Sequence, residues 1–179
     1  MRKGFTLVEI LIVIIVMSIL GAMMTYSSSQ AISSNKAAEI VVKLRNLKIA
    51  AMQMYVDKLD YWESSKDDSD NKFNMTELKK YLNDDKGYYD DDEDNTNDGF
   101  VLVTDDASKK YAERNWYAAC NIENYVAKDS DKVKEKLVKR KDTDELLGFN
   151  TALVNNGICT PIDPYNGSSV VLLRIRKAN

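Results

Sequence analysis

The chain changes abruptly near its N-terminus from polar to almost continuously apolar residues. After Arg2, Lys3 and Gly4, nearly every residue from Phe5 to Met24 is Leu, Ile, Val, Met or Ala. A helix of about 20 residues is roughly 30 Å long, which matches the hydrocarbon core of a bilayer. The pattern therefore predicts a membrane-spanning helix over residues 5–24.

A second pattern follows the serines at 27–29. Seven positions recur at alternating steps of three and four, which is typical of a helix with one buried side. They are Ala37, Ile40, Leu44, Leu47, Ala51, Met54 and Lys58. Because no proline occurs before Pro161, a single helix can run from residue 5 to about residue 60, with Gly21 and the serines as its only weak points.

Residues 61–179 provide enough chain for one small domain, a globular head. Residues 62–72 are predicted as a loop and residues 166–167, Asn-Gly, as a turn. Strands are predicted at 99–104, 116–126 and 170–176, and helical segments at 74–82, from 105 or 106 to 114, and from 130 to about 147, where Gly148 ends the helix. These elements indicate an α+β fold, in which the C-terminal half of the long helix packs on a small antiparallel sheet.

Glu9 is the acidic residue inside the apolar run. An ionised group in a membrane segment costs at least a few kcal/mol, so a partner or a function normally retains it there. Arg2 and Lys3 precede the run, and by the positive-inside rule they keep the N-terminus in the cytoplasm. We therefore expect the head to lie outside the cytoplasmic membrane.

The run Gly4–Glu9 (GFTLVE) and the apolar residues after it resemble the class III signal of type IV pilins and of the related pseudopilins of type II secretion and competence systems. This resemblance covers about the first 25 residues strongly and the following helix loosely. It implies that prepilin peptidase removes residues 1–4 by cutting after Gly4 and methylates the new amine of Phe5. A plain membrane anchor, the alternative, explains neither Gly4 nor the leader.

The resemblance implies a structural subunit that leaves the cytoplasmic membrane and polymerises into an extracellular type IV pilus. Its partners are then copies of itself, prepilin peptidase and the inner assembly machinery. We expect Phe5 and Glu9 to act in assembly, with the Glu9 carboxylate pairing with the Phe5 amine of a neighbouring subunit. A pseudopilin is the nearest alternative function, and a membrane-anchored surface binding protein or enzyme is a more remote one.

Composition argues against several other functions. The chain has no histidine, the commonest general base, and shows no Gly-rich phosphate loop, so we expect no enzymatic activity. Its net charge is −3, and nucleic acid is therefore not an expected partner. Residues 132–141 are rich in Lys and Arg, and we interpret them as the solvated side of a helix.

An acidic run extends from Asp90 to Asp98. We interpret it as a solvated loop, with no cofactor bound. Calcium binding is the alternative, because oxygen-bearing residues at alternate positions and a following glycine loosely copy a calcium loop. The residues concerned are Asp94, Thr96, Asp98, Gly99 and Asp105.

Cys120 and Cys159 are the two cysteines, and both lie in the part predicted to be extracellular. A pair of cysteines outside the cell favours a disulfide. In many pilins one such disulfide closes a loop near the C-terminus, so the resemblance also implies a disulfide here. Two buried free thiols are the alternative.

Peptide mapping without reductant tests this disulfide. We expect a linked pair of peptides containing Cys120 and Cys159, and reduction should lower the free energy of unfolding of the head by roughly 4 kcal/mol or less on loop-entropy grounds. Alkylation of both thiols in the unreduced protein after it is unfolded in denaturant would contradict the prediction.

Overall fold

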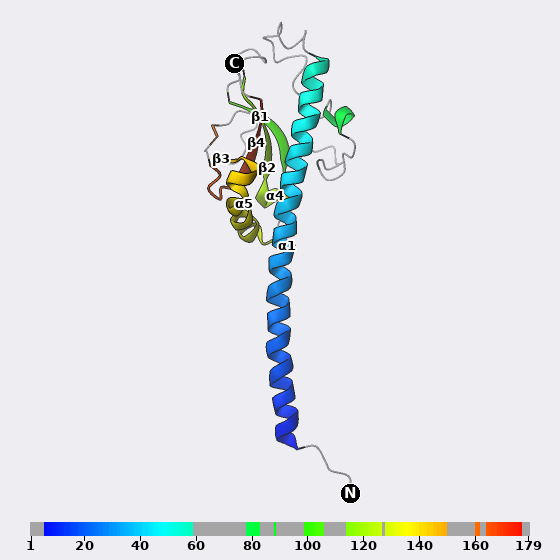
Figure 1. Ribbon diagram of the computed structural model, residues 1–179, viewed down its shortest axis with the longest axis vertical. Helices are drawn as coiled ribbons and strands as arrows, with labels where there is room; N and C mark the ends of the chain where they lie inside the picture. Colours follow the sequence, from blue (N-terminus) through cyan, green and yellow to red (C-terminus); the bar gives the residue numbers. More distant parts are fainter. Residues whose placement is uncertain are drawn as a thin grey trace.

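A single helix runs through most of the length of the molecule. The computed structural model describes residues 6–58, 78–82, 88, 99–105, 114–126, 128–149, 160–161 and 164–176. Helix α1 (Leu7–Asp57, 51 residues) continues through Gly21 and the serines without interruption. The head lies against its C-terminal half, and its N-terminal half extends as a bare rod (Figure 1). The predicted long helix is thus confirmed from Leu7 to Asp57.

The head contains an antiparallel sheet of four strands among the described residues. The strands are β1 (Phe100–Thr104), β2 (Trp116–Asn121), β3 (Leu146–Phe149) and β4 (Val170–Arg176). Their order is β1-β2-β4-β3, and each neighbouring pair is antiparallel. This arrangement confirms the predicted α+β layout.

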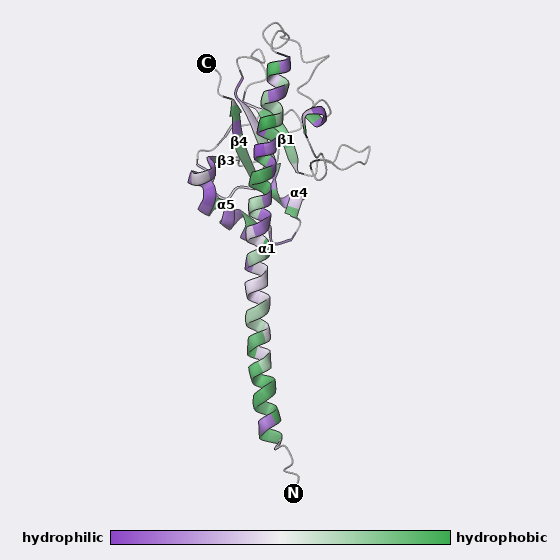
Figure 2. Cartoon of the chain, turned by 45° about the vertical axis from the view of Figure 1, so that its right-hand side comes forward, coloured by the Kyte–Doolittle hydropathy of each residue, from purple (hydrophilic) through white to green (hydrophobic). Residues whose placement is uncertain are grey.

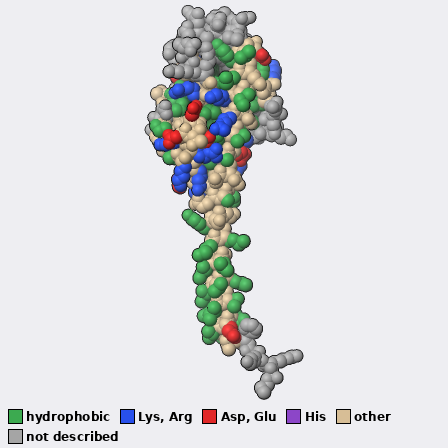
Figure 3. Space-filling view, in the orientation of Figure 1, with side chains coloured by type: hydrophobic (Ala, Val, Ile, Leu, Met, Phe, Trp, Pro, Cys, Tyr) green, Lys and Arg blue, Asp and Glu red, His purple; other side chains and the backbone are tan. Residues whose placement is uncertain are grey.

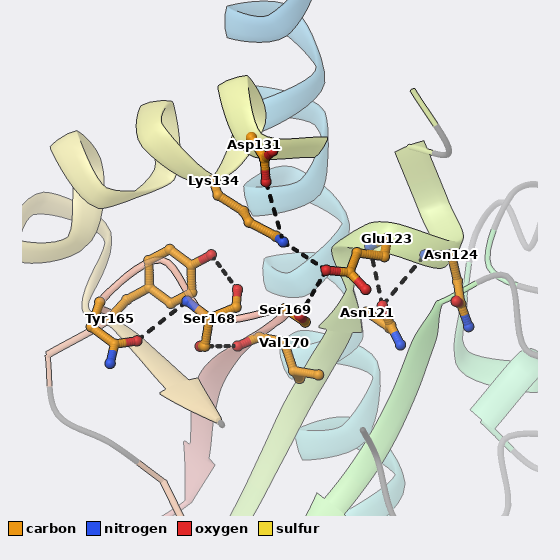
Figure 4. Close-up of polar contacts among 10 residues, drawn as sticks. Asn121, Glu123, Asn124, Asp131, Lys134, Tyr165, Ser168, Ser169 and Val170 are labelled. Carbon is orange, nitrogen blue, oxygen red and sulfur yellow. Dashed lines mark hydrogen bonds and ion pairs between the residues drawn. The ribbon is translucent and has the colours of Figure 1, made fainter. Parts of the chain in front are cut away.

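Short helices complete the described part of the head. They are the 3₁₀ turn η1 (Lys79–Tyr81) and the helices α4 (Ile122–Val126) and α5 (Ser130–Asp144). Figure 4 shows how α4 and α5 are joined to the start of β4: the Glu123 carboxylate accepts hydrogen bonds from Lys134 Nζ (2.7 Å) and from the Ser169 hydroxyl (2.8 Å).

The main core forms between α1 and the inner face of the sheet. Six of the seven predicted positions on α1 are buried, and the seventh, Lys58, is the C-terminal cap of the helix. Their cluster includes inner-face residues of all four strands, Phe100, Trp116, Ala118, Cys120, Leu146, Val171 and Leu173. A second buried cluster occupies the other face of the sheet: Val103, Tyr117, Ala119, Leu147, Phe149, Val170 and Leu172.

The predicted strand over 116–126 is too long. The strand β2 ends at Asn121, whose side-chain oxygen accepts hydrogen bonds from the backbone N–H groups of Glu123 and Asn124. A side chain that satisfies the free N–H groups of a first helical turn starts a helix. The chain therefore turns into α4 where the sequence suggested continued strand.

The predicted helix over 130–147 is also too long, and Gly148 does not end it. The helix α5 ends at Asp144, because Glu145 adopts the left-handed conformation (φ 54°), and residues 146–149 form β3. Gly148 lies inside that strand, where a Cβ would come within 2.8 Å of Ser168 Oγ. Its role is to allow close packing rather than to end a helix.

Other predicted elements are only partly described. Of the predicted helix over 74–82, residues 78–82 are described and contain η1. The predicted loop over 62–72 lies outside the described residues, as do residues 106–113 of the predicted helical turn.

Two polar clusters attach α1 to the head. In the first, Lys43 Nζ lies 4.6 Å from the ring centre of Tyr125 and donates to its hydroxyl (2.7 Å). The Tyr125 hydroxyl donates in turn to Glu39, and burial, with this carboxylate, raises the pKa of Tyr125. In the second, the Asp144 carboxylate accepts from Arg45 of α1 and from Arg140 of α5, each at 2.7 Å.

The second cluster gives a stability prediction. Asp144→Asn should lower the free energy of unfolding by about 1–3 kcal/mol, because the substitution removes a buried charge that two guanidinium groups contact. The matched control is Asp142→Asn, an exposed carboxylate on the same helix, which should change it by less than about 0.5 kcal/mol. Equal losses in urea unfolding of the two variants would contradict this role for Asp144.

Candidate functional site

In the single subunit, the apolar side chains of the N-terminal half of α1 are exposed and pack against no other part of the described chain. Its large side chains between Leu7 and Met24 are 47–82% exposed, from Val13 to Leu7. Apolar residues surround the rod in Figures 2 and 3. Among the described residues, α1 is the helix long and apolar enough to cross a membrane. Of the predicted span, the residues from Leu7 to Met24 are thus present as a continuous helix.

Two hydroxyl groups in and next to this segment are satisfied inside the helix. Ser18 Oγ donates to the Ile14 carbonyl (2.7 Å), and Thr25 Oγ1 donates to the Ala22 carbonyl (2.9 Å). A hydroxyl that bonds its own helix needs no external partner in hydrocarbon. The segment therefore offers an apolar surface to either lipid or another helix.

Glu9 belongs to a capping box at the start of α1. Thr6 is the N-cap residue, and its N–H and hydroxyl donate to Glu9 Oε2 at 2.8 and 2.9 Å. The Glu9 N–H donates back to Thr6 Oγ1 (3.3 Å). Within the described part of the chain Glu9 Oε1 accepts no hydrogen bond, so capping leaves one carboxylate oxygen for a second donor.

The spacing Thr6-x-x-Glu9 is itself a readable capping signal, and the sequence interpretation of Glu9 did not use Thr6. The predicted cleavage and methylation residues, Gly4 and Phe5, lie outside the described residues. Their roles therefore remain predictions.

The calcium candidates are only partly described. Asp94, Thr96 and Asp98 lie outside the described residues. The Asp105 carboxylate accepts hydrogen bonds from the backbone N–H (2.9 Å) and the side-chain amide of Asn115. Gly99 has φ +92°, and a Cβ at this position would come within 2.7 Å of the Asn121 carbonyl oxygen. The turn into β1 is therefore sufficient to explain why residue 99 is glycine, without a calcium site. No group of three metal-ligating side chains occurs among the residues described, and calcium binding stays the untested alternative to a solvated loop.

Cys120 is completely buried on the inner face of β2. Burial raises the pKa of its thiol, so that Cys120, as a free thiol, would be protonated and unreactive. Its predicted partner, Cys159, lies outside the described residues, so the disulfide remains a prediction.

The basic residues of α5 mostly contact acidic neighbours. Lys132 pairs with Asp129 and Lys139 with Glu135, at 2.8 and 2.7 Å. Lys132 Nζ also donates to Ser29 Oγ of α1 (2.8 Å), which fixes the start of α5 beside the end of the bare rod. These pairs agree with a solvated helix side that also supports the docking of the head.

Comparison with known proteins identifies only the N-terminal region. Residues 1–25 match the model of the prokaryotic N-terminal methylation motif. Neither curated proteins nor solved structures give a significant match. The chain therefore carries the class III signal of type IV pilins and pseudopilins, and this signal precedes an α+β layout that matches the type IV pilin-like fold.

Proposed function

We propose that this protein is a structural subunit of an extracellular type IV pilus, matured by cleavage after Gly4 and N-methylation of Phe5. The observation that carries the proposal is the uncovered apolar half of α1, which lies within the residues that match the methylation motif. A helix that is apolar on all sides is stable in lipid or among other apolar helices, and not in water. Before assembly the membrane surrounds the apolar helix with lipid. After assembly a bundle of identical helices surrounds it with other apolar side chains, so the helix is kept out of water in both states.

The continuity of α1 supports a filament over a simple anchor. The same helix that forms the apolar rod also provides the buried side of the head core. A subunit withdrawn from the membrane therefore keeps its head fixed to the rod. Repeated head-to-tail contacts that do not close on themselves generate a helical filament.

A pseudopilin of a type II secretion or competence machine is the second candidate. The methylation motif is common to both classes, and assembly uses the same helix. Abundant surface filaments sheared from cells and identified by mass spectrometry would support the pilus, whereas a secretion or transformation defect in a deletion strain without such filaments would support the pseudopilin. Absence of both would favour a membrane-anchored surface protein.

Processing provides the first test. The intact mass of the mature protein should lack residues 1–4 and include one additional methyl group, and Gly4 replaced by a bulky residue should leave the leader attached. A mature protein that still begins at Met1, or that begins beyond Leu20, would exclude the pilin interpretation.

The role of Glu9 provides the second test. We propose that Glu9 pairs with the Phe5 amine of a neighbouring copy, which offsets the charge of both groups in an apolar environment. Glu9→Leu, although more apolar, should still be cleaved after Gly4 but should give at least about tenfold fewer filaments, since loss of a buried pair costs several kcal/mol.

Glu9→Gln separates pairing from helix capping, because glutamine retains the capping box and lacks the charge. Filament counts from strains whose only copy carries the substitution provide the measurement. We expect Glu9→Gln to fail as Glu9→Leu does. If Glu9→Gln formed normal filaments and Glu9→Leu formed few, the ion pair would be ruled out, and helix capping would be the remaining role of Glu9 in assembly.

A further inference from the structure

Two arginines from different helices share one buried carboxylate at the junction of α1 and α5. Asp144 Oδ1 accepts a hydrogen bond from Arg45 Nη2, and Asp144 Oδ2 accepts one from Arg140 Nε, each at 2.7 Å. The Asp144 side chain is 3% exposed, whereas those of Arg45 and Arg140 are 54 and 39% exposed. Because one carboxylate cannot balance two guanidinium charges, a fixed positive charge remains at this surface.

Both guanidinium groups keep donors for a ligand. A guanidinium has five N–H donors in a planar fork. Arg45 and Arg140 each use one of them on Asp144, and within the described part of the chain neither makes another hydrogen bond. The two ion pairs hold the arginines in place before a ligand arrives, which lowers the entropy cost of binding. Arginines placed in this way bind phosphate and similar oxyanions through paired hydrogen bonds.

Two lysines extend this positive surface. Lys48 follows Arg45 by three residues on α1, and Lys136 precedes Arg140 by four on α5, so each lysine lies beside one of the arginines. Both lysines are partly exposed, and neither forms an ion pair with a residue that the structure describes. We call Arg45, Lys48, Lys136 and Arg140 the basic patch.

The exposed carboxylates of α5 lie on its outward side. At about 100° per residue, they fall roughly 160–200° round the helix from the buried Val133. They are Asp131, Glu135 and Asp142. The side of α5 next to α1 is thus left basic, and Figure 3 shows Lys and Arg side chains gathered over α5 and the adjoining part of α1.

The membrane surface is too far away to be the ligand of the basic patch. Arg45 follows Met24 by 21 residues, which places it about 32 Å beyond the apolar segment along the continuous helix. The polar headgroup layer extends only about 5–8 Å beyond the hydrocarbon core. The basic patch is therefore open to an anionic ligand from outside the membrane.

The composition of the basic patch favours a sugar polymer over nucleic acid. None of its four residues is aromatic, so it offers no platform on which bases could stack. Duplex DNA carries one negative charge per about 1.7 Å, and the carboxylates on the outward side of α5 repel so dense a charge. Neighbouring positions on a helix surface are about 5–6 Å apart, which suits a chain with one anionic group per sugar or polyol unit.

We propose that the basic patch binds a linear polymer of sugar or polyol units that carries phosphate or sulfate groups. Arg45 and Arg140 hold one oxyanion between them, and Lys48 and Lys136 contact the groups on either side along the polymer. The head thereby has a binding activity in addition to its structural role. This activity belongs to the single subunit, so it does not depend on the proposed filament.

Binding to the full-length subunit in nanodiscs of zwitterionic lipid tests the proposal. The probes are fluorescently labelled heparin, which carries sulfate, and labelled poly(glycerol phosphate), and the readout is fluorescence anisotropy at physiological salt. We expect saturable binding, and the probe with the lower Kd identifies the preferred oxyanion. Absence of saturable binding of both probes would refute the proposal.

The two lysines localise the binding. Lys48→Gln and Lys136→Gln should each raise Kd at least about fivefold and keep the thermal unfolding midpoint, since neither lysine has a partner among the described residues. The matched control is Lys36→Gln, which removes the same charge nine residues, and thus about 180°, from Arg45 on α1. It should change Kd by less than about twofold. Equal losses from all three variants would show attraction by overall charge alone and would refute the basic patch.

Arg140→Lys separates the arginine fork from charge alone. Lysine keeps the positive charge beside Asp144 but lacks the planar pair of donors, so Kd should rise at least about fivefold. An unchanged Kd would refute the role of the arginines. A labelled DNA duplex with the same number of charges is the final comparison. We expect it to bind more weakly than the polymer probes, and tighter binding would refute a sugar polymer in favour of nucleic acid.

Discussion

The packing of one side of α1 against the inner face of the sheet determines how the rest of the molecule is arranged. The buried positions from Ala37 to Met54 form the main core together with β1, β2, β3 and β4. This contact fixes which side of the helix faces the head. The remaining surface of α1, the bare rod and the exposed side beside the head, consequently has a defined direction relative to the head.

Polar contacts set the rotation of the head about α1 more closely than apolar packing alone. Lys132 contacts Ser29, Lys43 contacts Tyr125, and Arg45 contacts Asp144, so the attachment points are distributed along the helix from the end of the rod upward. Hydrogen bonds with charged groups are directional and depend on short distances. A head that rotated about the helix would lose all three. Subunits held in this way present the same surfaces to every neighbour.

The sequence correctly predicted those helices and strands for which the local residue pattern and the packing in the folded protein favour the same structure. The stripe on α1 was readable because it repeats over several turns, and β1 and β4 because their β-branched and apolar runs are bounded by turn residues. The strand β3 was missed because it has four residues and follows α5 after Glu145 alone, a residue type that rarely adopts the left-handed conformation. Gly148 appeared as a helix stop because its actual constraint, Ser168, is distant in sequence.

For the candidate site, the sequence identified Glu9 and the apolar run but not the geometry that surrounds them. The capping contact with Thr6 followed from a local spacing and was within reach of the sequence. The ion pair between Arg45 and Asp144 joins residues 99 positions apart, and no local pattern reveals it.

The apolar segment and the head share one continuous helix, α1. Pulsed electron–electron spin resonance between genetically encoded spin labels at Tyr26 and Gln53, in subunits embedded in lipid nanodiscs, tests it most directly. These positions are 27 residues apart, and a continuous helix predicts one narrow distance distribution near 40 Å. A broad distribution, or a main distance well below this value, would show that the helix bends or breaks between membrane and head and would contradict the account.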